Sequence, residues 1–408
     1  MKVLFVCHRL PFPPKRGGKI RPFNIIRHLS EQHDVTVCSI ARSRDEEEEG
    51  RGLSQHCARV FVGRVSNGVQ AARMLARLPT REPSSMGWFH SGALARRVSA
   101  LLRNERFDLI FVHCSSVAHY VAGARDTPRI LDFGDMDSQK WLEYFHYRRM
   151  PMKYGYWLEG RKLEAEERRL AREFGFCTAT TRAEWETLNG YGTGAGTDWF
   201  PNGVDAAFFA PEDAADYDPD QVCFVGRMDY YPNQECMDDF CRNAWPSVLA
   251  KRPSMKLAIV GADPSPAVRR LGELPNVTVT GSVPDVRPYV RRSAAMIAPL
   301  NIARGTQNKI LEGMAMGVPV VTSSVAAGGV DAVPGEHLWV ADRADAVADA
   351  LVALASDPAR RNALGRAGRE RVLSHHAWTS SMQRLDAIIE RRLGLWTREA
   401  GTAGGMKQ

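Results

Sequence analysis

The first half of the chain alternates short, almost continuous apolar runs with polar stretches of helical spacing. The runs are KVLFVCH at 2–8, HDVTVCSI at 33–40, CARVFVGRV at 57–65, RFDLIFVHCSS at 106–116 and PRILDFGD at 128–135. Strands that are apolar on both faces are typical of parallel sheets covered by helices on both sides. The pattern predicts a doubly wound parallel α/β sheet, with a helix near 18–31 and the acidic run RDEEEEG at 44–50 as a solvated turn.

The second half begins the same alternation again. Its strand-like runs are QVCFVGRM, MKLAIVGA, NVTVTGSV, AAMIAPL, VPVVTSS and HLWVAD. A charged helix around 150–176 comes before it, and the Gly-rich segment YGTGAGTDWFPNGVD at 191–205 is the best candidate for a domain boundary. Two similar open α/β sheets in tandem are expected to form a cleft where the carboxyl ends of their strands meet.

These boundaries predict four parts. They are a Rossmann-like domain at 1–197, a second at 198–375, a helix at 376–394 that crosses back to the first domain, and a disordered tail at 395–408.

Composition narrows the class of protein. The chain has 408 residues, of which 44% are hydrophobic and 25% are charged, as in ordinary globular proteins. No apolar run approaches the roughly 20 residues of a membrane span, and the start MKVLFVCHRLPFPP reads as a strand, so we expect a cytoplasmic protein. The eight cysteines show neither a C-x-x-C pair nor matched Cys/His spacing, which disfavours structural zinc and a disulfide framework.

The net charge of +7 admits nucleotide, membrane or nucleic-acid partners. No nucleic-acid-binding module is recognisable, and the aromatic residues do not interleave with a basic stripe, so we expect no nucleic-acid partner.

The stretch RGTQNKILEGMAMGVPVVTSS, at 304–324, predicts a polar loop, a slim helix and a buried strand. Polar groups at the start of a helix that follows a strand are how α/β proteins present backbone N–H groups to an anion. The stretch therefore indicates an anion-binding site.

Other loops follow strands in the same way. HRLPFPPKRGGKI at 8–20 ends in Gly17 and Gly18, which let a backbone approach a ligand, but it matches neither G-x-G-x-x-G nor a P-loop. His113 ends the run DLIFVH, and Gly226 with Arg227 follows the first strand of the second half. A tight turn for the glycines and a structural role for the histidine remain open alternatives.

The order and spacing of these segments resemble the retaining glycosyltransferases of family 4, which have the GT-B fold, over essentially the whole chain. The segments that carry the resemblance are PPKRGG, FDLIFVH, FPNGVD, FVGR, AIVGADP, VTGSV and KILEGMAMGVPVVTS. More narrowly, FVGRMDYYPNQE with ARGTQNKILEGMAMGVPVV is similar to bacterial sugar transferases of exopolysaccharide clusters and exosortase systems.

The resemblance implies a role for individual residues. Glu312 matches a glutamate that accepts hydrogen bonds from the donor's ribose hydroxyls, and Arg227 matches an arginine that grips the donor diphosphate. His113 matches a histidine near the transferred sugar. The remaining residues implied in donor binding are Gly17, Gly18, Gly226, Gly281, Ser282, Val283, Arg304, Gly305, Thr306, Gln307 and Asn308, of which 281–283 would read the base.

Two positions depart from the family pattern. Arg304 stands where the family has the first of two paired glutamates, eight positions before Glu312. Asn233 stands where the family has a lysine, six residues after Arg227. Lys309, in the same helix as Glu312, is expected to supply the missing positive charge, so the implied catalytic set is His113, Arg227 and Lys309.

The function implied is transfer of a sugar, with retention, from a nucleoside-diphosphate sugar to a glycan or lipid-linked acceptor, without a metal or other cofactor. The segment DMD at 135–137 superficially looks like a metal clamp but reads as a helix start, with Asp137 and Ser138 as capping residues. Arg304 and Asn233 leave open an inactive sugar-nucleotide-binding module, and an epimerase or phosphorylase on the same fold is a further alternative.

The segment 66–106 predicts a membrane-facing surface. The segment contains seven arginines but only two acidic residues, Glu82 and Glu105; the arginines are Arg73, Arg77, Arg81, Arg96, Arg97, Arg103 and Arg106. Its apolar residues are Leu75, Leu78, Met86, Trp88, Phe89, Leu94 and Leu101. Basic and apolar residues together suit an anionic lipid surface at the inner face of the plasma membrane. The alternative is an ordinary loop and helix at the rim of the cleft.

Overall fold

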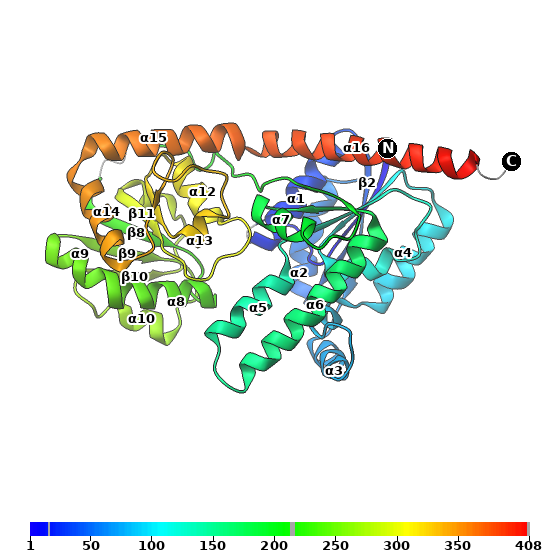
Figure 1. The fold of residues 1–408 in the computed structure, drawn as a ribbon, viewed down its shortest axis with the longest axis horizontal. Coiled ribbons are helices and arrows are strands. Elements are labelled where there is room, and N and C mark those ends of the chain that lie inside the picture. Colours follow the sequence, from blue (N-terminus) through cyan, green and yellow to red (C-terminus); the bar gives the residue numbers. More distant parts are fainter. Residues whose placement is uncertain (15–16, 213–216, 406–408) are drawn as a thin grey trace. The chain divides into compact units, whose positions relative to one another are not determined.

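The computed structural model describes residues 1–14, 17–212 and 217–405, with side chains described up to Trp396. The chain forms two compact units. The N-terminal unit comprises Met1–Phe200 with Met382–Gln408, and the C-terminal unit comprises Pro201–Ser381 (Figure 1).

The N-terminal unit is built on a parallel seven-stranded sheet in the order β3-β2-β1-β4-β5-β6-β7. The strands are β1 (Lys2–Cys7), β2 (Asp34–Ala41), β3 (Arg59–Arg64), β4 (Leu109–His113), β5 (Arg129–Gly134), β6 (Phe176–Ala179) and β7 (Gly196–Trp199). β1 pairs with both β2 and β4, so the winding direction reverses between β1 and β4. In open α/β sheets such a switch point is where ligands bind.

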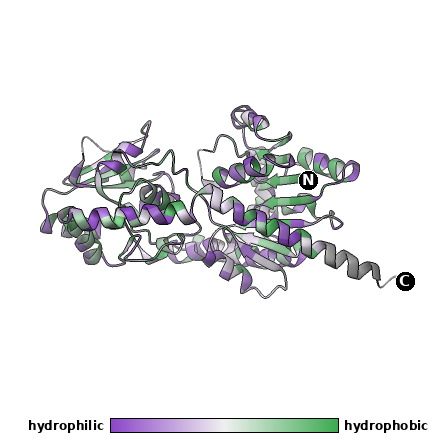
Figure 2. Cartoon of the chain, turned by 90° about the horizontal axis from the view of Figure 1, so that it is seen from above, coloured by the Kyte–Doolittle hydropathy of each residue, from purple (hydrophilic) through white to green (hydrophobic). Residues whose placement is uncertain are grey.

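Helices cover both faces of this sheet because its strands are apolar on both sides (Figure 2). α4 (Gly92–Asn104) and α6 (Met152–Phe174) bury Val98 and Leu170 in a core cluster with the β1 residue Leu4. Phe5, the next residue along β1, points to the other face and stacks on Phe111 at 5.2 Å between ring centroids.

Two further helices of this unit are joined to each other. α1 (Gly17–Ser30) and α16 (Trp378–Gly405) are linked by a 2.8 Å contact between His28 Nε2 and Asp386 Oδ1. The other helices of the unit are α2 (Arg44–Glu49), α3 (Asn67–Arg77), α5 (Asp137–Tyr147) and α7 (Arg182–Asn189), with 3-10 turns at Gly50–Gln55, Ser85–Phe89 and Ser115–Val121.

The C-terminal unit has a parallel six-stranded sheet in the order β10-β9-β8-β11-β12-β13. Its strands are β8 (Asp218–Val225), β9 (Lys256–Val260), β10 (Val277–Gly281), β11 (Ser293–Ala298), β12 (Val320–Thr322) and β13 (Trp339–Val340). Its helices are α8 (Tyr231–Asp239), α9 (Trp245–Lys251), α10 (Pro266–Leu271), α11 (Arg287–Arg291), α12 (Asn308–Ala315), α13 (Ser324–Ala327), α14 (Ala344–Ser356) and α15 (Pro358–His375), with a π-helical turn at Phe240–Ala244. All six strands expected in this half are present, and its switch point lies between β8 and β11.

The structure differs from the sequence expectations in four local features. The acidic run forms helix α2 instead of a solvated turn, because Ser43 Oγ accepts a hydrogen bond from the Glu46 N–H and three acidic residues occupy the first turn. The segment read as a linker contributes β7 to the first sheet. α16 continues as helix through 395–405, where a disordered tail is expected, and 406–408 lie outside the described residues.

The fourth difference is the start of α5. This helix begins at Asp137, as the helix-start interpretation of DMD requires, but neither Asp137 nor Ser138 caps it. The Met136 N–H instead donates to Glu184 Oε2 at 2.8 Å, and the Ser138 N–H to Glu167 Oε1 at 2.9 Å. Carboxylates from α7 and α6 therefore satisfy this helix start.

The exposed apolar residues expected between 66 and 106 are mostly not exposed. Of the seven apolar residues named for this surface, Leu75 and Leu78 are exposed, whereas Met86, Leu94 and Leu101 are buried, and Trp88 and Phe89 are half-buried. Among the residues that the structure describes, no helix is long and apolar enough to cross a bilayer.

Candidate functional site

Bare backbone lines one edge of the C-terminal sheet, where β8, β9 and β10 end. Gly226, Gly261 and Gly281 follow or end these three neighbouring strands. A Cβ atom on Gly261, whose φ is +153°, would lie 1.8 Å from the Gly226 carbonyl oxygen. Gly281, at φ +70°, accepts a 3.2 Å hydrogen bond from the Gly261 N–H. The ends of β8 and β9 are packed too closely for side chains, and the positive φ of Gly281 favours glycine, so this edge presents peptide groups.

Asn233 joins this edge to helix α12. Its Nδ2 donates to the Arg227 carbonyl at 2.8 Å, and its Oδ1 accepts from Lys309 Nζ at 2.6 Å. The Lys309 ammonium also lies 4.5 Å from the centre of the Phe224 ring. The asparagine that replaces the family lysine thus holds a lysine contributed by a different element.

Lys309 and Glu312 lie one turn apart on α12 and influence each other's protonation. Burial lowers the pKa of Lys309 to about 8. Burial raises the pKa of Glu312 to about 7, although the nearby Lys309 opposes that shift. Near neutral pH, Lys309 is therefore an ammonium ion, and Glu312 is a mixture of the carboxylate and the neutral acid.

The loop before α12 and the first residue of that helix hold buried polar atoms that have no partner. Thr306 Oγ1 and Asn308 Oδ1 make no hydrogen bond, and Gln307, at the N-cap position, gives no side-chain cap. Glu235 Oε2 on α8 is also buried without a partner, while its Oε1 accepts from Asn301 Nδ2 at 3.0 Å. Because buried polar groups in proteins are nearly always paired, these atoms indicate a place for a polar ligand.

Two glycines give this loop and helix their shape. Gly305 has φ +63°, and its carbonyl oxygen would lie only 2.2 Å from a Cβ on Gly329. A Cβ on Gly313 would lie 3.0 Å from Met296 Sδ and 3.1 Å from Val320 Cγ2. The small residues of α12 therefore let the helix lie close against β11 and β12. Arg304 is exposed, and its carbonyl accepts from Gln307 Nε2 at 3.0 Å.

Arg227 is held by two aspartates. Its Nε and Nη2 pair with the carboxylate of Asp229 at 2.9 and 2.6 Å, and Nη2 also contacts Asp263 Oδ2 at 2.8 Å. Asp263 has φ +55°, an unusual conformation for a residue other than glycine. The sequence analysis missed both aspartates, although they stand in the motifs FVGRMD and AIVGADP that it singled out.

In the N-terminal unit, His113 ends β4 at the switch point. Its Nδ1 lies 2.8 Å from Asp132 Oδ2, and that fully buried carboxylate also accepts from Arg21 Nε and Nη2, both at 2.9 Å, and from Thr178 Oγ1 at 2.9 Å. Burial opposes ionisation of Asp132, but Arg21 and His113 outweigh it and hold its pKa below the ordinary value. An ionised Asp132 fixes the His113 proton on Nδ1 and leaves Nε2 as an acceptor.

His8, which follows β1, is a residue that the sequence analysis missed. Its ring lies 5.7 Å from that of His113, its Nδ1 is buried without a partner, and burial lowers its pKa well below the ordinary value. The signal available in the sequence was its position directly after the first strand.

The structure separates the candidate residues into two groups. Gly17, Gly18 and His113 belong to the N-terminal unit, where the two glycines begin α1 and 15–16 lie outside the described residues. All others belong to the C-terminal unit, where hydrogen bonds join Arg227 to Lys309 through Asn233. In the loop after β10, Ser282 is exposed and Val283 packs against the core.

Family models match both halves of the chain. The model described as "Glycosyltransferase Family 4" matches residues 16–208, and the model described as "Glycosyl transferases group 1" matches residues 219–357.

A curated relative matches part of the chain. It is the GDP-mannose-dependent monoacylated alpha-(1-6)-phosphatidylinositol monomannoside mannosyltransferase of Corynebacterium glutamicum, 27% identical over 211 residues. The match covers 47% of this chain and 55% of the relative, so the chain spans about half the length of this protein.

Solved structures of similar fold cover nearly the whole chain. The sucrose-phosphate synthase of Thermosynechococcus elongatus superposes with a TM-score of 0.70 at 18% identity, over 97% of this chain and 100% of that one. HepE from Anabaena in complex with UDP-glucose gives 0.65 at 14% identity, over 96% and 100%. TarM gives 0.67 at 10% identity, over 95% and 98%. Each half of this chain therefore resembles a glycosyltransferase domain, and its two parallel α/β sheets have the GT-B fold.

Proposed function

We propose that this protein transfers a sugar from a nucleoside-diphosphate sugar to a glycan or lipid-linked acceptor, with retention of the anomeric configuration. The observation that carries the proposal is the start of α12. There Asn233 orients the ammonium of Lys309, and two buried atoms have no partner, one on Thr306 in the preceding loop and one on Asn308, the first residue of the helix. An ammonium, unpaired polar groups and the N-terminus of a helix suit a diphosphate.

The other residues are assigned by the same chemistry. Glu312 accepts hydrogen bonds from the ribose hydroxyls, and the bare edge at Gly281 lets a flat base lie against peptide groups. Arg227 turns part of its guanidinium from Asp229 and Asp263 to the diphosphate, where it and Lys309 stabilise the charge that develops as the diphosphate leaves.

The N-terminal unit supports transfer without a carboxylate nucleophile. The oxygens of Asp132 are occupied by Arg21, Thr178 and His113. In the proposed step the bond from the anomeric carbon to the leaving phosphate breaks, and the bond to the acceptor oxygen forms on the same face. The acceptor proton passes to a leaving-phosphate oxygen, while His113 Nε2 accepts a hydrogen bond from the sugar.

The similar proteins guide the choice of substrates. One is a GDP-mannose-dependent transferase with a lipid acceptor, and another was solved with UDP-glucose. We therefore place GDP-mannose and UDP-glucose first among the donors. We assign the protein to cell-surface or exopolysaccharide synthesis, on the inner face of the plasma membrane and without a metal or other cofactor.

The test is release of sugar from a panel of UDP- and GDP-sugars, with and without lipid-linked acceptors. Slow release to water by the wild type, lost in Lys309→Ala, is the expected result. Tight nucleotide-sugar binding with no release from any donor would instead support the inactive binding module.

A further inference from the structure

Helices α5 and α6 form an antiparallel hairpin in which the facing sides of the two helices pack against each other. Between the two helices Trp141 packs on Tyr156 at 5.2 Å, and Tyr144 meets Tyr156 edge-on at 5.7 Å between ring centroids. A Cβ on Gly160 would lie 2.8 Å from Leu142 Cγ, so the helices approach closely there. The hairpin is therefore a packed element, and Figure 1 shows α5 and α6 extending from the sheet of their unit.

A second set of large apolar residues lies on the outside of this hairpin. Their exposed fractions run from 39% to 65%, and they are Tyr147, Met150, Met152, Tyr154, Trp157 and Leu158. Six exposed large apolar residues within twelve positions form a patch of a kind that ordinary protein surfaces avoid.

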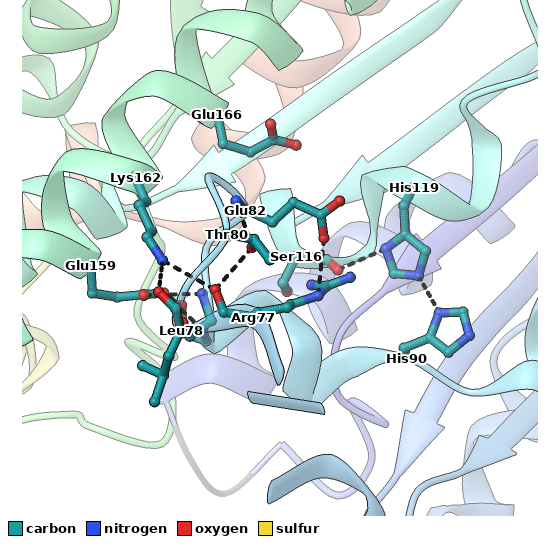
Figure 3. Close-up of polar contacts among 12 residues, drawn as sticks. Arg77, Leu78, Thr80, Glu82, His90, Ser116, His119, Glu159, Lys162 and Glu166 are labelled. Carbon is teal, nitrogen blue, oxygen red and sulfur yellow. Dashed lines mark hydrogen bonds and ion pairs between the residues drawn. The ribbon is translucent and has the colours of Figure 1, made fainter. Parts of the chain in front are cut away.

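Two exposed leucines at the C-terminal end of α3, Leu75 and Leu78, extend this patch. Lys162 Nζ on α6 donates to the carbonyls of Arg77 at 3.2 Å and Leu78 at 2.9 Å (Figure 3). Leu158 lies four residues before Lys162, on the same face of α6. Leu75 and Leu78 are 65% and 51% exposed. We call the six hairpin residues together with Leu75 and Leu78 the hairpin surface.

Every charge between 144 and 158 is basic. Arg148, Arg149 and Lys153 interleave with the apolar residues, and the stretch contains no acidic residue. The flanking carboxylates are Glu143, which is half-buried, and Glu159, which is buried and accepts from the N–H groups of Ser84 and Ser85 at 3.0 and 2.7 Å. Two copies of such a surface would repel each other, whereas an anionic lipid headgroup layer would attract it.

We propose that the hairpin surface docks on an anionic lipid bilayer. Met, Trp and Tyr side chains enter the boundary between headgroups and acyl chains, while the basic side chains pair with lipid phosphates. Docking brings the N-terminal unit to a lipid-linked acceptor. The role of docking in reaching this acceptor rests on the proposed function. Docking itself requires neither a sugar donor nor sugar transfer.

The experiment is sedimentation of the full-length protein with vesicles of phosphatidylcholine alone and of phosphatidylcholine mixed with phosphatidylglycerol. We expect binding to the mixed vesicles that weakens with salt. The variant Met150→Ser/Met152→Ser/Trp157→Ser should lose binding by about tenfold or more. Arg149→Glu/Lys153→Glu should lose roughly fivefold or more for each charge.

The matched control is Val333→Ser/Leu373→Ser, which removes similarly exposed residues, 46% and 44%, from the C-terminal unit. It should bind vesicles like the wild type, and thermal unfolding should show every variant folded. Equal binding to pure phosphatidylcholine, or unchanged binding by the Met150/Met152/Trp157 variant, would overturn the proposal. So would a dimer in solution that this variant dissolves.

Sugar release from nucleotide sugars, measured without vesicles, separates this proposal from the proposed function. The hairpin variants should keep that release while losing vesicle binding. A wild type that binds mixed vesicles but releases no sugar from any donor would leave docking intact and remove only the proposed transfer.

Discussion

The amide of Asn233 binds a backbone carbonyl with one end and an ammonium with the other. A sequence motif records only which residue stands at a position, whereas the site depends on where the charge lies in space. In the proposed site, Lys309 contributes the positive charge that the family motif places at 233, and Asn233 holds Lys309 in position.

This exchange predicts a rescue by swapping the two residues. Lys309→Asn should weaken nucleotide-sugar binding by about 1.5–3 kcal/mol, the usual value of a hydrogen bond to a charged group, and leave nucleoside binding unchanged. Adding Asn233→Lys should restore much of the loss in calorimetry. Lys251→Ala, which removes an exposed lysine paired with Asp349, is the control. Equal losses for nucleoside and nucleotide would make Lys309 an ordinary surface charge.

Glu312 predicts a pH dependence of stability. Its pKa is about 7 in the fold against an ordinary 4.5, so its protonated form stabilises the folded state. That contribution is complete below pH 4.5 and is lost as the pH rises through 7, at a cost of at most about 3 kcal/mol. Glu312→Gln should flatten urea-unfolding stability between pH 5 and pH 8 while weakening nucleotide binding. A helix-capping glutamate would predict lost stability at both pH values and unchanged nucleotide affinity.

Arg304 distinguishes two readings of the donor. It can pair with a carboxylate on the sugar, or it can turn to the diphosphate and leave the sugar to Gly305 and Thr306. We favour the diphosphate. Arg304→Glu should then abolish binding of every nucleotide sugar, because an anion would face the phosphates. Robust transfer of a neutral sugar by this variant would support the uronic-acid reading instead.

Among the elements, the strands were the most predictable from sequence. The apolar runs at 2–8 and 33–40 form β1 and β2. A strand that is buried on both faces consists almost entirely of apolar residues, so it is easily recognised in the sequence. β7 was missed since GTDW is short and half-buried, and α2 was missed because its cap is a single serine before a run of acids.

The sequence predicted which residues belong to the site, but not which other residues they contact. Arg227, Lys309 and Glu312 stand in recognisable motifs, yet the pairing of Arg227 with Asp263 and of Lys309 with the Asn233 amide depends on contacts across 36 and 76 residues. Such pairs are set by the docking of one loop on another, which local periodicity does not encode.

The glycine edge predicts an effect on both stability and binding. Gly261→Ala would place a methyl group 1.8 Å from the Gly226 carbonyl oxygen, so β8 and β9 must separate. We expect a loss of about 2 kcal/mol or more in denaturant unfolding, together with weaker nucleotide binding. Gly68→Ala, in α3 with nothing within 4 Å, should be neutral or stabilising by up to about 1 kcal/mol. Equal effects of the two substitutions would contradict the close packing.

At the scale of the whole molecule, the N-terminal unit is assembled from both ends of the chain. Leu385, Ile388 and Ile389 on α16 are buried, and Arg391 pairs with Asp198 at 2.8 Å. The last helix therefore belongs to the unit that the first residue begins.

Two leucines of α16 test this assembly. Leu385→Ala removes a fully buried side chain and should cost about 2–5 kcal/mol, whereas Leu395→Ala changes one that is 38% exposed and should cost little. Calorimetry should show the loss in the N-terminal unit's transition, with that of the C-terminal unit unchanged. A loss of stability confined to the C-terminal unit's transition would contradict the assignment of α16 to the N-terminal unit.

Because the N-terminal unit contains both ends of the chain, the two units are completed in a fixed order during synthesis. As the chain leaves the ribosome, residues 1–200 emerge without α16, and their sheet must wait until the whole C-terminal unit has been translated. At roughly 5–20 residues per second that wait lasts about 10–40 s. During it the C-terminal unit, which is continuous in sequence, has every residue it needs, while the N-terminal unit exposes the surface that Leu385 and Ile388 later cover. A newborn chain of this protein is therefore expected to complete its second unit first and to depend most on chaperones in the half that was made earliest.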